Sequence, residues 1–289
     1  MKVEKWSLPS ILITIVLILL VLVMVYPFLY MISVSLSDSI YVMRGEVTWF
    51  PKGLDFSTYQ LVLNDARISQ SYLNTIIYVS LGTLISLVVT AFGAYSLARR
   101  DMLFHRGFTL LIIFTMFFQG GMIPTFLAVK SMGIMDSVWA MVLPGAVSTW
   151  NLLVMRTFFA NFPTELEEAG RMDGLSDFGI FTRIVAPLSQ AVFATIGLFY
   201  AVAMWNNFMF PLLYLRDPEL FPLQVVLRNI VLAGSNAGSE SMGVGSDAMV
   251  VEESLKYATI MVSTIPILLL YPMLQKYFVK GVMIGAVKG

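Results

Sequence analysis

The sequence predicts an all-α membrane protein, and three observations carry this prediction. Hydrophobic residues make up 58% of the 289 positions and charged residues only 12%, whereas a soluble domain has roughly 25% charged residues. Six stretches are apolar and long enough to cross a bilayer core of about 30 Å as helices, which pair their own backbone polar groups. With one histidine, no cysteine and a net charge of zero, the sequence argues against disulfides, thiolate or histidine metal centres and a nucleic-acid surface.

The six predicted spans form a single membrane domain over residues 1–289. The first span is longer than the apolar core of a signal peptide, which has about 7–15 residues, so we expect an uncleaved anchor. Two polar segments, 36–72 and 214–256, are expected to be surface loops, and the second has a glycine- and serine-rich centre. The spans cover residues 11–33, 73–97, 107–129, 137–159, 186–213 and 257–276.

The distribution of basic residues predicts the orientation. Eleven of the 18 lysines and arginines fall on the side that holds both termini and the loop 161–185. Because lysine and arginine are enriched in cytoplasmic loops, we expect this side to be cytoplasmic. The two long polar segments, 36–72 and 214–256, would then lie outside the cell.

The predicted spans hold almost no charge, and this restricts what the protein can do. An ion-coupled transporter generally needs ionisable side chains inside the membrane, and a self-powered pump needs a glycine-rich phosphate loop, which this sequence lacks. The spans also lack a pair of groups for general acid–base catalysis, so we expect no catalytic residue and no enzyme. If the protein moves a solute uphill, another subunit supplies the energy.

Uncharged polar side chains beside aromatic rings are the candidates for a solute pathway. A ring can cover the C–H face of a sugar while amides form directional hydrogen bonds, so this inventory favours hydroxyl-rich ligands. The same residue types also serve as contacts between membrane helices, and that alternative stays open. The strongest candidate is the triplet 205–207. The candidates are Gln119, Asn151, Tyr200, Trp205, Asn206 and Asn207.

The loop 161–185, called the elbow below, is the most informative segment. Thr164 and Glu167 form the pattern of a capping box at the start of a helix. Gly174 is a typical residue to end that helix in a left-handed backbone conformation, and a second helix can start at Ser176. The first helix is too short to be stable alone in water, so we expect it to dock on another protein.

The surface of the first elbow helix suits such docking. Ala169 and Gly170 would let another backbone approach, Met172 offers an adaptable apolar contact, and Glu167 can pair with Arg171 one turn later. The alternative is an amphipathic turn that lies on the membrane. The excess of acidic residues in the elbow disfavours it, because anionic lipid would repel them.

The elbow resembles a known signature, that of the permeases of binding-protein-dependent ABC importers. The matching residues are Glu168-Ala169-Gly170, then Gly174 after three residues, then Ile184-Val185-Ala186-Pro187 after nine more. Gly170 and Ala186 depart from the signature, at its third residue and at its leucine. The resemblance covers nearly the whole chain and is greatest to the smaller permease of maltose-type sugar importers. Within that group, the ending 278–289 is similar to a branch that handles complex oligosaccharides such as alginate and rhamnogalacturonan fragments.

This resemblance implies a type I ABC importer permease fold, with both termini cytoplasmic and the elbow as coupling helix. A second homologous permease would face this chain, two cytoplasmic ATPases would hold ATP and Mg²⁺, and an extracytoplasmic sugar-binding protein would deliver an oligosaccharide. The chain itself would bind no cofactor and no metal. It would be a multi-pass protein of the bacterial cytoplasmic membrane.

The resemblance also implies roles for particular residues. The end of the chain, 280–289, is expected to reach the ATPases, and the segment 220–253 to probe the binding protein. ATPase coupling is implied for Glu168, Ala169, Gly170, Arg171, Asp173, Gly174 and Pro187, and contact with the binding protein for Gly234, Ser235, Asn236 and Gly238.

Two alternatives remain open. The chain could be an ABC permease for another solute, such as a peptide, amino acid or polyamine, or a membrane scaffold that binds a partner through the elbow without transport. A sugar is favoured over a dicationic solute, because such a solute would prefer a carboxylate inside the membrane.

Overall fold

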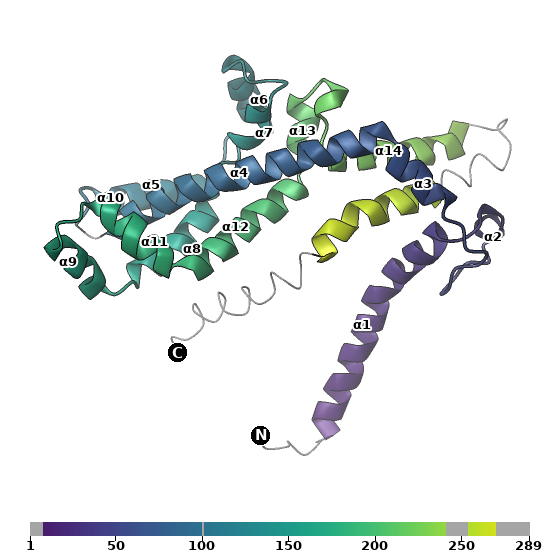
Figure 1. The fold of residues 1–289 in the computed structure, drawn as a ribbon, viewed down its shortest axis with the longest axis horizontal. Coiled ribbons are helices and arrows are strands. Elements are labelled where there is room, and N and C mark those ends of the chain that lie inside the picture. Colours follow the sequence, from purple (N-terminus) through teal and green to yellow (C-terminus); the bar gives the residue numbers. More distant parts are fainter. Residues whose placement is uncertain (1–7, 100, 241–253, 270–289) are drawn as a thin grey trace. The chain divides into compact units, whose positions relative to one another are not determined.

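The computed structural model describes residues 8–99, 101–240 and 254–269, with only the backbone given for 233–240. These residues form helices and turns (Figure 1), and their only strand-like pairing is one isolated bridge between Ser37 and Leu54. The all-α prediction is therefore confirmed. The chain divides into two units, Met1–Ser69 with Val226–Pro266 and Gln70–Val225 with Ile267–Gly289, which we describe separately.

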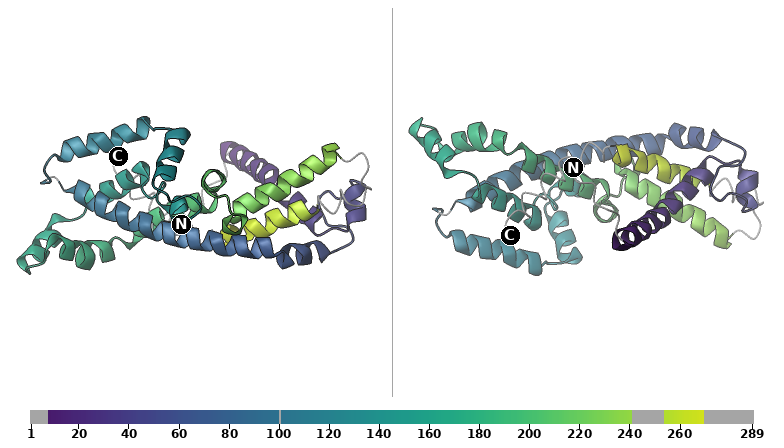
Figure 2. Two further views of the ribbon diagram at one scale, coloured as in Figure 1. Left: turned by 90° about the horizontal axis from the view of Figure 1, so that it is seen from above. Right: turned by 90° about the horizontal axis from the view of Figure 1, so that it is seen from below.

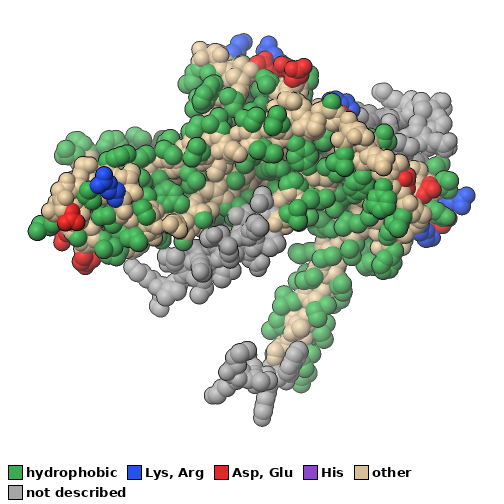
Figure 3. Space-filling model, viewed as in Figure 1, with side chains coloured by type: hydrophobic (Ala, Val, Ile, Leu, Met, Phe, Trp, Pro, Cys, Tyr) green, Lys and Arg blue, Asp and Glu red, His purple; other side chains and the backbone are tan. Residues whose placement is uncertain are grey.

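The first unit begins with α1 (Leu8–Ser35), a helix of 28 residues. Its length of about 42 Å, at 1.5 Å per residue, is sufficient to cross a bilayer core. Hydrophobic side chains line the face of α1 that Figure 3 shows, most apolar side chains along the helix are exposed, and burial within the structure begins only near its end, at Ser33. There the Ser33 hydroxyl donates to the Trp49 carbonyl oxygen at 2.9 Å, and the Ser35 and Tyr59 hydroxyls lie 2.8 Å apart. A helix that is apolar all round is suited to lipid or to a partner helix.

The expected loop 36–72 contains two short helices, α2 (Ser39–Met43) and α3 (Ser57–Asn64). Asp38 caps α2, because its carboxylate accepts the Ile40 N–H at 2.9 Å. The segment is thus a folded connection rather than an irregular loop.

The expected loop 214–256 differs more from the prediction, because it contains the 18-residue helix α14 (Leu223–Glu240). Apolar residues at helical spacing, such as Leu223, Val226 and Leu227, form its first turns. The glycine- and serine-rich stretch after them suggested a loop, yet the helix extends into it as far as Glu240. A further apolar helix covers Ser254–Leu269 and corresponds to the start of the sixth span.

The second unit is built on α4 (Ala66–Ala98), one helix of 33 residues that includes the predicted span 73–97. Two glycines let neighbouring helices approach it. The thioether of Met204 packs against Gly82, and a β-carbon on Gly93 would lie 3.2 Å from the Leu152 Cδ1 atom.

The third predicted span, 107–129, is wrong as a single helix. It consists of α5 (His105–Phe117) and α6 (Met122–Ser131), which are bent by 113° relative to each other. Gly121 lies in the break with a φ angle of 83°, a conformation that glycine adopts readily.

The fourth predicted span, 137–159, is also interrupted. It consists of α7 (Val138–Val142) and α8 (Thr149–Ala160). Pro144 and Gly145 stand in the break, and both disfavour the helix interior.

The fifth predicted span, 186–213, is divided into α11 (Ala186–Leu188), α12 (Gln190–Trp205) and α13 (Met209–Tyr214). The helical stretch Asp177–Leu188 meets α12 at 84°. Within the described residues, two helices, α1 and α4, are long and apolar enough to cross a membrane alone, and up to four spans result if each bent pair counts as one.

The core of the second unit has two apolar clusters. One includes Ala94, Met155, Ile180, Val185 and Ile196, which are all buried, and joins α4, α8 and α12 to the elbow. The other lies around Tyr78, Met141 and Tyr214, where α4, α7 and α13 meet. These clusters fix both ends of α4 relative to its neighbours within this unit.

Candidate coupling elbow and solute pathway

The first helix of the elbow, α9, covers Thr164–Met172. The predicted capping box is wrong, because the helix begins at Thr164 itself and Pro163 occupies the cap position without a side-chain hydrogen bond. Proline fixes its own φ angle near the value found here and therefore starts the helix by geometry alone. The side chain of Glu167 is free to point elsewhere.

The turn after α9 agrees with the prediction. Gly174 has a φ angle of 79°, and its N–H donates to the Arg171 carbonyl oxygen at 3.0 Å. This is expected for a glycine whose left-handed backbone conformation ends an α-helix. Ser176 caps the next helix, α10 (Asp177–Ile180), by accepting the Gly179 N–H at 3.2 Å. The path of the elbow therefore follows from its local sequence.

A π-helical turn over Phe181–Val185 joins α10 to α11. Pro187 follows within α11 and has no N–H to donate to the preceding turn, so a regular α-helix cannot pass through this point unchanged. The wider π turn accommodates this loss.

Gly170 faces the inside of the elbow. It is buried, and a β-carbon added to it would lie 2.7 Å from Ile184 Cδ1 and 3.2 Å from Ile180 Cγ1. The expectation that Gly170 would admit the backbone of a partner is therefore wrong, because its own elbow occupies that space. The departure from the family signature at this position has a packing cause.

Arg99, just after α4, is the centre of the charge interactions of the elbow. Its Nη1 atom lies 2.5 Å from Asp177 Oδ1, and its Nη2 atom lies 3.1 Å from Asp101 Oδ2. The hydrogen bond from Arg99 lowers the pKa of the Asp101 carboxyl below its usual value. Arg171 pairs with Asp177 at 3.6 Å, so the predicted pair of Arg171 with Glu167 is wrong.

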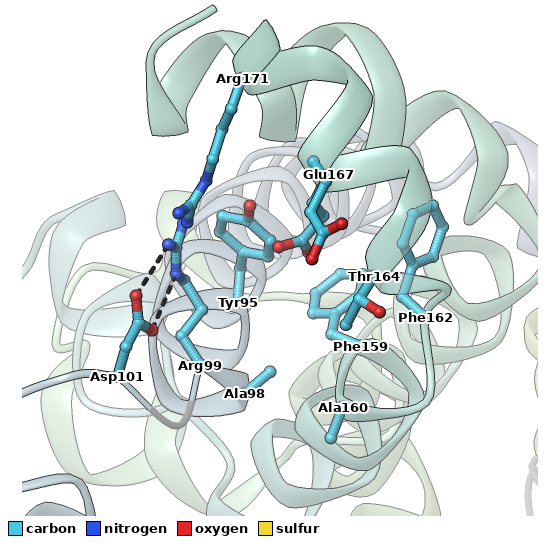
Figure 4. Close-up of a pocket in the computed structure, with 11 residues that line it drawn as sticks. Tyr95, Ala98, Arg99, Asp101, Phe159, Ala160, Phe162, Thr164, Glu167 and Arg171 are labelled. Atoms are coloured by element: carbon cyan, nitrogen blue, oxygen red, sulfur yellow. Dashed lines mark hydrogen bonds and ion pairs between the residues drawn. The ribbon is translucent and has the colours of Figure 1, made fainter.

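A cavity of about 520 Å³ lies between α9 and the ends of α4 and α8 (Figure 4). Glu167 lies beside Tyr95 in it, and Phe159 and Phe162 provide apolar walls. Desolvation raises the pKa of Glu167 above its usual value, and the positive charge of Arg99 opposes this shift. The lining of the cavity thus combines aromatic rings with the carboxylates of Asp101, Glu167 and Glu168.

The predicted coupling residues are divided by their accessibility. Glu168, Ala169, Arg171, Asp173 and Gly174 are all exposed in this chain. Together with Met172, whose side chain is 89% exposed, they form an open face on and after α9. Gly170 lies beneath that face, and Pro187 is exposed on the separate helix α11.

The triplet 205–207 lies at the end of α12. The indole of Trp205 is buried and meets the Tyr72 ring edge-on, with centroids 6.4 Å apart. Asn206 is exposed, and its amide donates to the Val202 carbonyl oxygen at 2.8 Å. Asn207 accepts the Phe210 N–H at 3.2 Å, so both asparagines also help to end one helix and begin the next.

Tyr200 is buried, and its hydroxyl joins three helices. It lies 2.7 Å from the Thr90 hydroxyl and accepts the Ser148 N–H at 2.9 Å. Tyr200 therefore acts here as an interhelical contact, and its expected contact with a solute stays a prediction.

The other two pathway candidates lie apart from the triplet. Asn151 is buried in the first turn of α8, and Gln119 is exposed in the break between α5 and α6. Among the described residues, no interaction joins either of them to the triplet 205–207.

Some predicted contacts lie outside the described part of the structure. Nothing is described of residues 270–289, which include the end expected to reach the ATPases. The backbone of Gly234, Ser235, Asn236 and Gly238 belongs to α14, and their side chains are outside the description.

Sequence reasoning missed Arg99 and Tyr95 as parts of the elbow. Arg99 counted only as one of the basic residues that set the orientation, because its partner Asp177 is 78 residues away. The sequence held one weak indication of this role: Asp101 lies two residues after Arg99, so an ion pair between them could be expected. No group of three or more acidic or histidine residues in the described chain could hold a metal ion.

Comparison with known proteins agrees with this geometry. The family described as "Binding-protein-dependent transport system inner membrane component" matches residues 103–284. The polygalacturonan/rhamnogalacturonan transport system permease protein YtcP of Bacillus subtilis (strain 168) is 44% identical over 239 residues, which are 83% of this chain and 84% of that protein. The arabinooligosaccharides transport system permease protein AraQ of the same organism is 27% identical over 242 residues, which are 83% of this chain and 81% of that protein.

A solved structure is similar over nearly the whole length. It is the crystal structure of a bacterial ABC transporter involved in the import of the acidic polysaccharide alginate, and one of its chains matches with a TM-score of 0.87. The two chains are 33% identical, and the match covers 95% of this chain and 99% of that one. The predicted type I permease fold is confirmed by this match. The chain belongs to the family of binding-protein-dependent transport system inner membrane components, the permeases of ABC importers.

Proposed function

We propose that this chain is one of two permease subunits that form the membrane pathway of an ATP-driven oligosaccharide importer in the bacterial cytoplasmic membrane. The observation that carries this proposal is the 44% identity to the polygalacturonan/rhamnogalacturonan permease over most of both chains. The match to a chain of the alginate importer supports it. Polygalacturonan and alginate are both polymers of sugar acids, so the cargo we favour is an oligosaccharide that contains uronic acid.

The energy for this transport comes from partner subunits. Two cytoplasmic ATPases hold ATP and Mg²⁺, and each docks on the elbow of one permease. The exposed face formed by Glu168, Ala169, Arg171, Asp173 and Gly174 supports this docking, because α9 is too short to be stable without neighbours and leaves this face uncovered. ATP can drive the pore only if the contact between elbow and ATPase differs between the two states of the importer.

The opposite side of the membrane meets the sugar-binding protein. In this proposal both termini and the elbow are cytoplasmic, and the segment that contains α14 is extracytoplasmic. Gly234, Ser235, Asn236 and Gly238 contact the binding protein there. Trp205 and Asn207 contact the sugar on its way through the pore, with Asn206, Tyr200, Asn151 and Gln119 as further candidates.

A neutral oligosaccharide is the second candidate cargo. The similarity to the arabinooligosaccharide permease favours it, and so do the uncharged amides and rings of the proposed pathway, which need no charge on the sugar.

The test is reconstitution of this chain with its neighbouring permease and candidate ATPase in nanodiscs. The ATPase rate is measured with a binding protein loaded from a panel of oligogalacturonides, alginate oligomers and arabinooligosaccharides. We expect stimulation by an acidic oligosaccharide. Stimulation by arabinooligosaccharides alone would support the second candidate, and no ATPase association would contradict the proposed role of the elbow.

A charge reversal tests the docking face separately. Glu168→Lys is expected to release the ATPase while the chain stays in the membrane, because Glu168 is exposed on α9 and lies outside the predicted spans. Lys130→Glu, a charge reversal at an exposed residue at the end of α6, is the matched control. Full transport by Glu168→Lys would contradict the assignment.

A further inference from the structure

Arg99 fastens the elbow to the end of α4. Its guanidinium bridges Asp101 and Asp177, and only 15% of its side chain is exposed, whereas that of Asp177 is 68% exposed. The shielding of Arg99 reduces the screening of this pair by salt. Arg171 approaches the same Asp177 carboxylate at 3.6 Å, so α9 and α4 are both held to the first residue of α10.

Aromatic rings join the same elements beside the ion pair. The ring centroids of Phe92 and Tyr95, both on α4, each lie 5.0 Å from that of Phe181 in the π turn. Phe92 also stacks on Phe178 of α10 at 5.9 Å. A rotation of the elbow relative to α4 would break these contacts together with the ion pair, so the cheaper motion is for the two elements to move as one.

The other end of α4 holds the turn 217–223, which leads into α14. The Asn74 amide donates to the carbonyl oxygens of Glu219 at 2.6 Å and Phe221 at 3.1 Å. Asn74 is buried, so loss of its amide would leave two backbone carbonyls without this donor, and an unsatisfied buried polar group is costly.

Two further residues of α4 complete this contact. The Tyr78 hydroxyl donates to the Leu220 carbonyl oxygen at 2.8 Å, and the buried Thr75 hydroxyl accepts the Leu223 N–H at 2.9 Å. Four backbone groups of the turn are therefore bound by three side chains on neighbouring turns of one helix. A displacement of this end of α4 must carry the turn with it.

Between these two ends α4 is unbroken. Its 33 residues contain no proline and extend about 50 Å at 1.5 Å per residue, and both views of Figure 2 show it as one continuous helix. The other predicted spans described in this unit are all interrupted. A broken helix can absorb a movement at its hinge, whereas a continuous helix transmits it to its far end.

We propose that Arg99 is a positioning residue for transport: it makes α4 follow the elbow, and α4 carries the motion to the turn 217–223 through Asn74, Thr75 and Tyr78. The inference rests on the proposed function, in which the elbow meets the ATPase and the segment after this turn meets the binding protein. Arg99 itself touches neither nucleotide nor sugar. Its role is to couple the state of the ATPase to the state of the binding protein.

The test uses the complete importer in nanodiscs with Arg99→Gln at one end of α4 and Asn74→Leu at the other. Two quantities are measured: the factor by which the loaded binding protein raises the ATPase rate, and the sugar transported per ATP. We expect each variant to lower the stimulation factor at least about fivefold, the lower range of allosteric coupling, with the ATPase still bound. Arg99→Lys should restore part of it, because lysine can still pair with Asp177.

The combined variant separates transmission from two unrelated defects. If α4 transmits one motion, Arg99→Gln with Asn74→Leu loses no more stimulation than either change alone, whereas independent defects add. Additive losses would overturn the proposal. Arg106→Gln is the matched control, since Arg106 is an exposed arginine close to Arg99 in sequence that has no ion pair among the described residues, and its stimulation should equal that of the unchanged chain.

A second readout does not depend on the cargo. Hydrogen exchange of the elbow, residues 161–185, is compared between the unchanged chain and Arg99→Gln in the assembled importer without sugar. Faster exchange in the variant is expected if Arg99 fastens the elbow, and equal exchange would overturn that role. Absence of stimulation of the unchanged importer by every sugar would contradict the proposed function instead, so the two failures are distinguishable.

Discussion

Gly170 of α9 packs against Ile184 of the π turn so closely that a β-carbon on the glycine would lie 2.7 Å from the Ile184 Cδ1 atom. This contact sets the distance between the helix that is proposed to meet the ATPase and the turn that leads into α12. It also explains why glycine stands at a position where the family signature has alanine: the neighbouring side chain fills the space that a methyl group would need.

The first prediction concerns this contact. Gly170→Ala gains about 1 kcal/mol of helix propensity, but it forces the end of the Ile184 side chain to move. We expect a larger share of the gain to appear when Ile184→Val removes the more crowded methyl group, while Ile180 Cγ1, at 3.2 Å, still limits it. The measurement is the protection of α9 backbone amides in hydrogen exchange for both single variants and the double variant. A full gain from Gly170→Ala alone would show that Ile184 gives way at no cost.

The second prediction concerns the turn that ends α9. A non-glycine residue at the φ angle of 79° adopted by Gly174 is strained by about 1 kcal/mol, and a β-branched residue by more. Because a β-carbon there would meet no atom within 4 Å, backbone strain is the only local cost. We expect Gly174→Asn to keep most transport and Gly174→Val to lose most of it, measured as sugar uptake. Equal uptake by both variants would contradict a left-handed turn.

Local signals explain which parts of the elbow could be predicted. The start of α10 at Ser176 and the stop at Gly174 each depend on residues within a few positions, and both predictions are confirmed. The capping box at Thr164 failed for a local reason as well, because Pro163 before it already fixes the start of the helix. Interactions between residues close in sequence therefore determine where most helices of the elbow begin and end.

Long-range contacts explain what could not be predicted. The pair of Arg99 and Asp177 joins residues 78 positions apart, and Asn74 meets Phe221 across 147 positions. The breaks inside the third and fourth spans also escaped prediction, because hydropathy measures the length of an apolar stretch and not the continuity of its helix. The glycines and the proline in these two breaks were visible, yet such residues also occur inside continuous membrane helices.

The third prediction uses the raised pKa of Glu167. Burial in the cavity disfavours the ionised carboxylate and raises its pKa above the ordinary value of 4.5. The folded state therefore holds the proton to a higher pH than the unfolded state does. The ionised group therefore costs stability at neutral pH, and this cost disappears as the pH falls through the raised folded pKa. We expect Glu167→Gln to raise the unfolding temperature at pH 7 and to have little effect near pH 4. A constant difference across this range would show that the carboxylate is not desolvated.

The fourth prediction distinguishes packing from solute contact at Tyr200. Tyr200→Phe removes the hydroxyl that accepts the Ser148 N–H and meets Thr90. We expect a loss of stability of about 1 kcal/mol, the usual scale for such a bond between membrane helices, with an unchanged KM for uptake by the folded protein. Thr90→Val, which removes one of the two partners, should cost less. A raised KM in Tyr200→Phe would instead place its hydroxyl in the solute pathway.

The last prediction concerns Asn207, a half-buried pathway candidate. It lines a small cavity with Thr75, Met204 and Pro222, and its side-chain oxygen already accepts the Phe210 N–H, which leaves the amide protons for a ligand. If those protons donate to a sugar hydroxyl, Asn207→Ala removes about 1 kcal/mol of binding, which corresponds to about fivefold in uptake. Binding of the ATPase should be unaffected. Asn64→Ala, on an exposed asparagine at the end of α3, is the matched control. Unchanged uptake together with a lower unfolding temperature in Asn207→Ala would restrict Asn207 to its role at the start of α13.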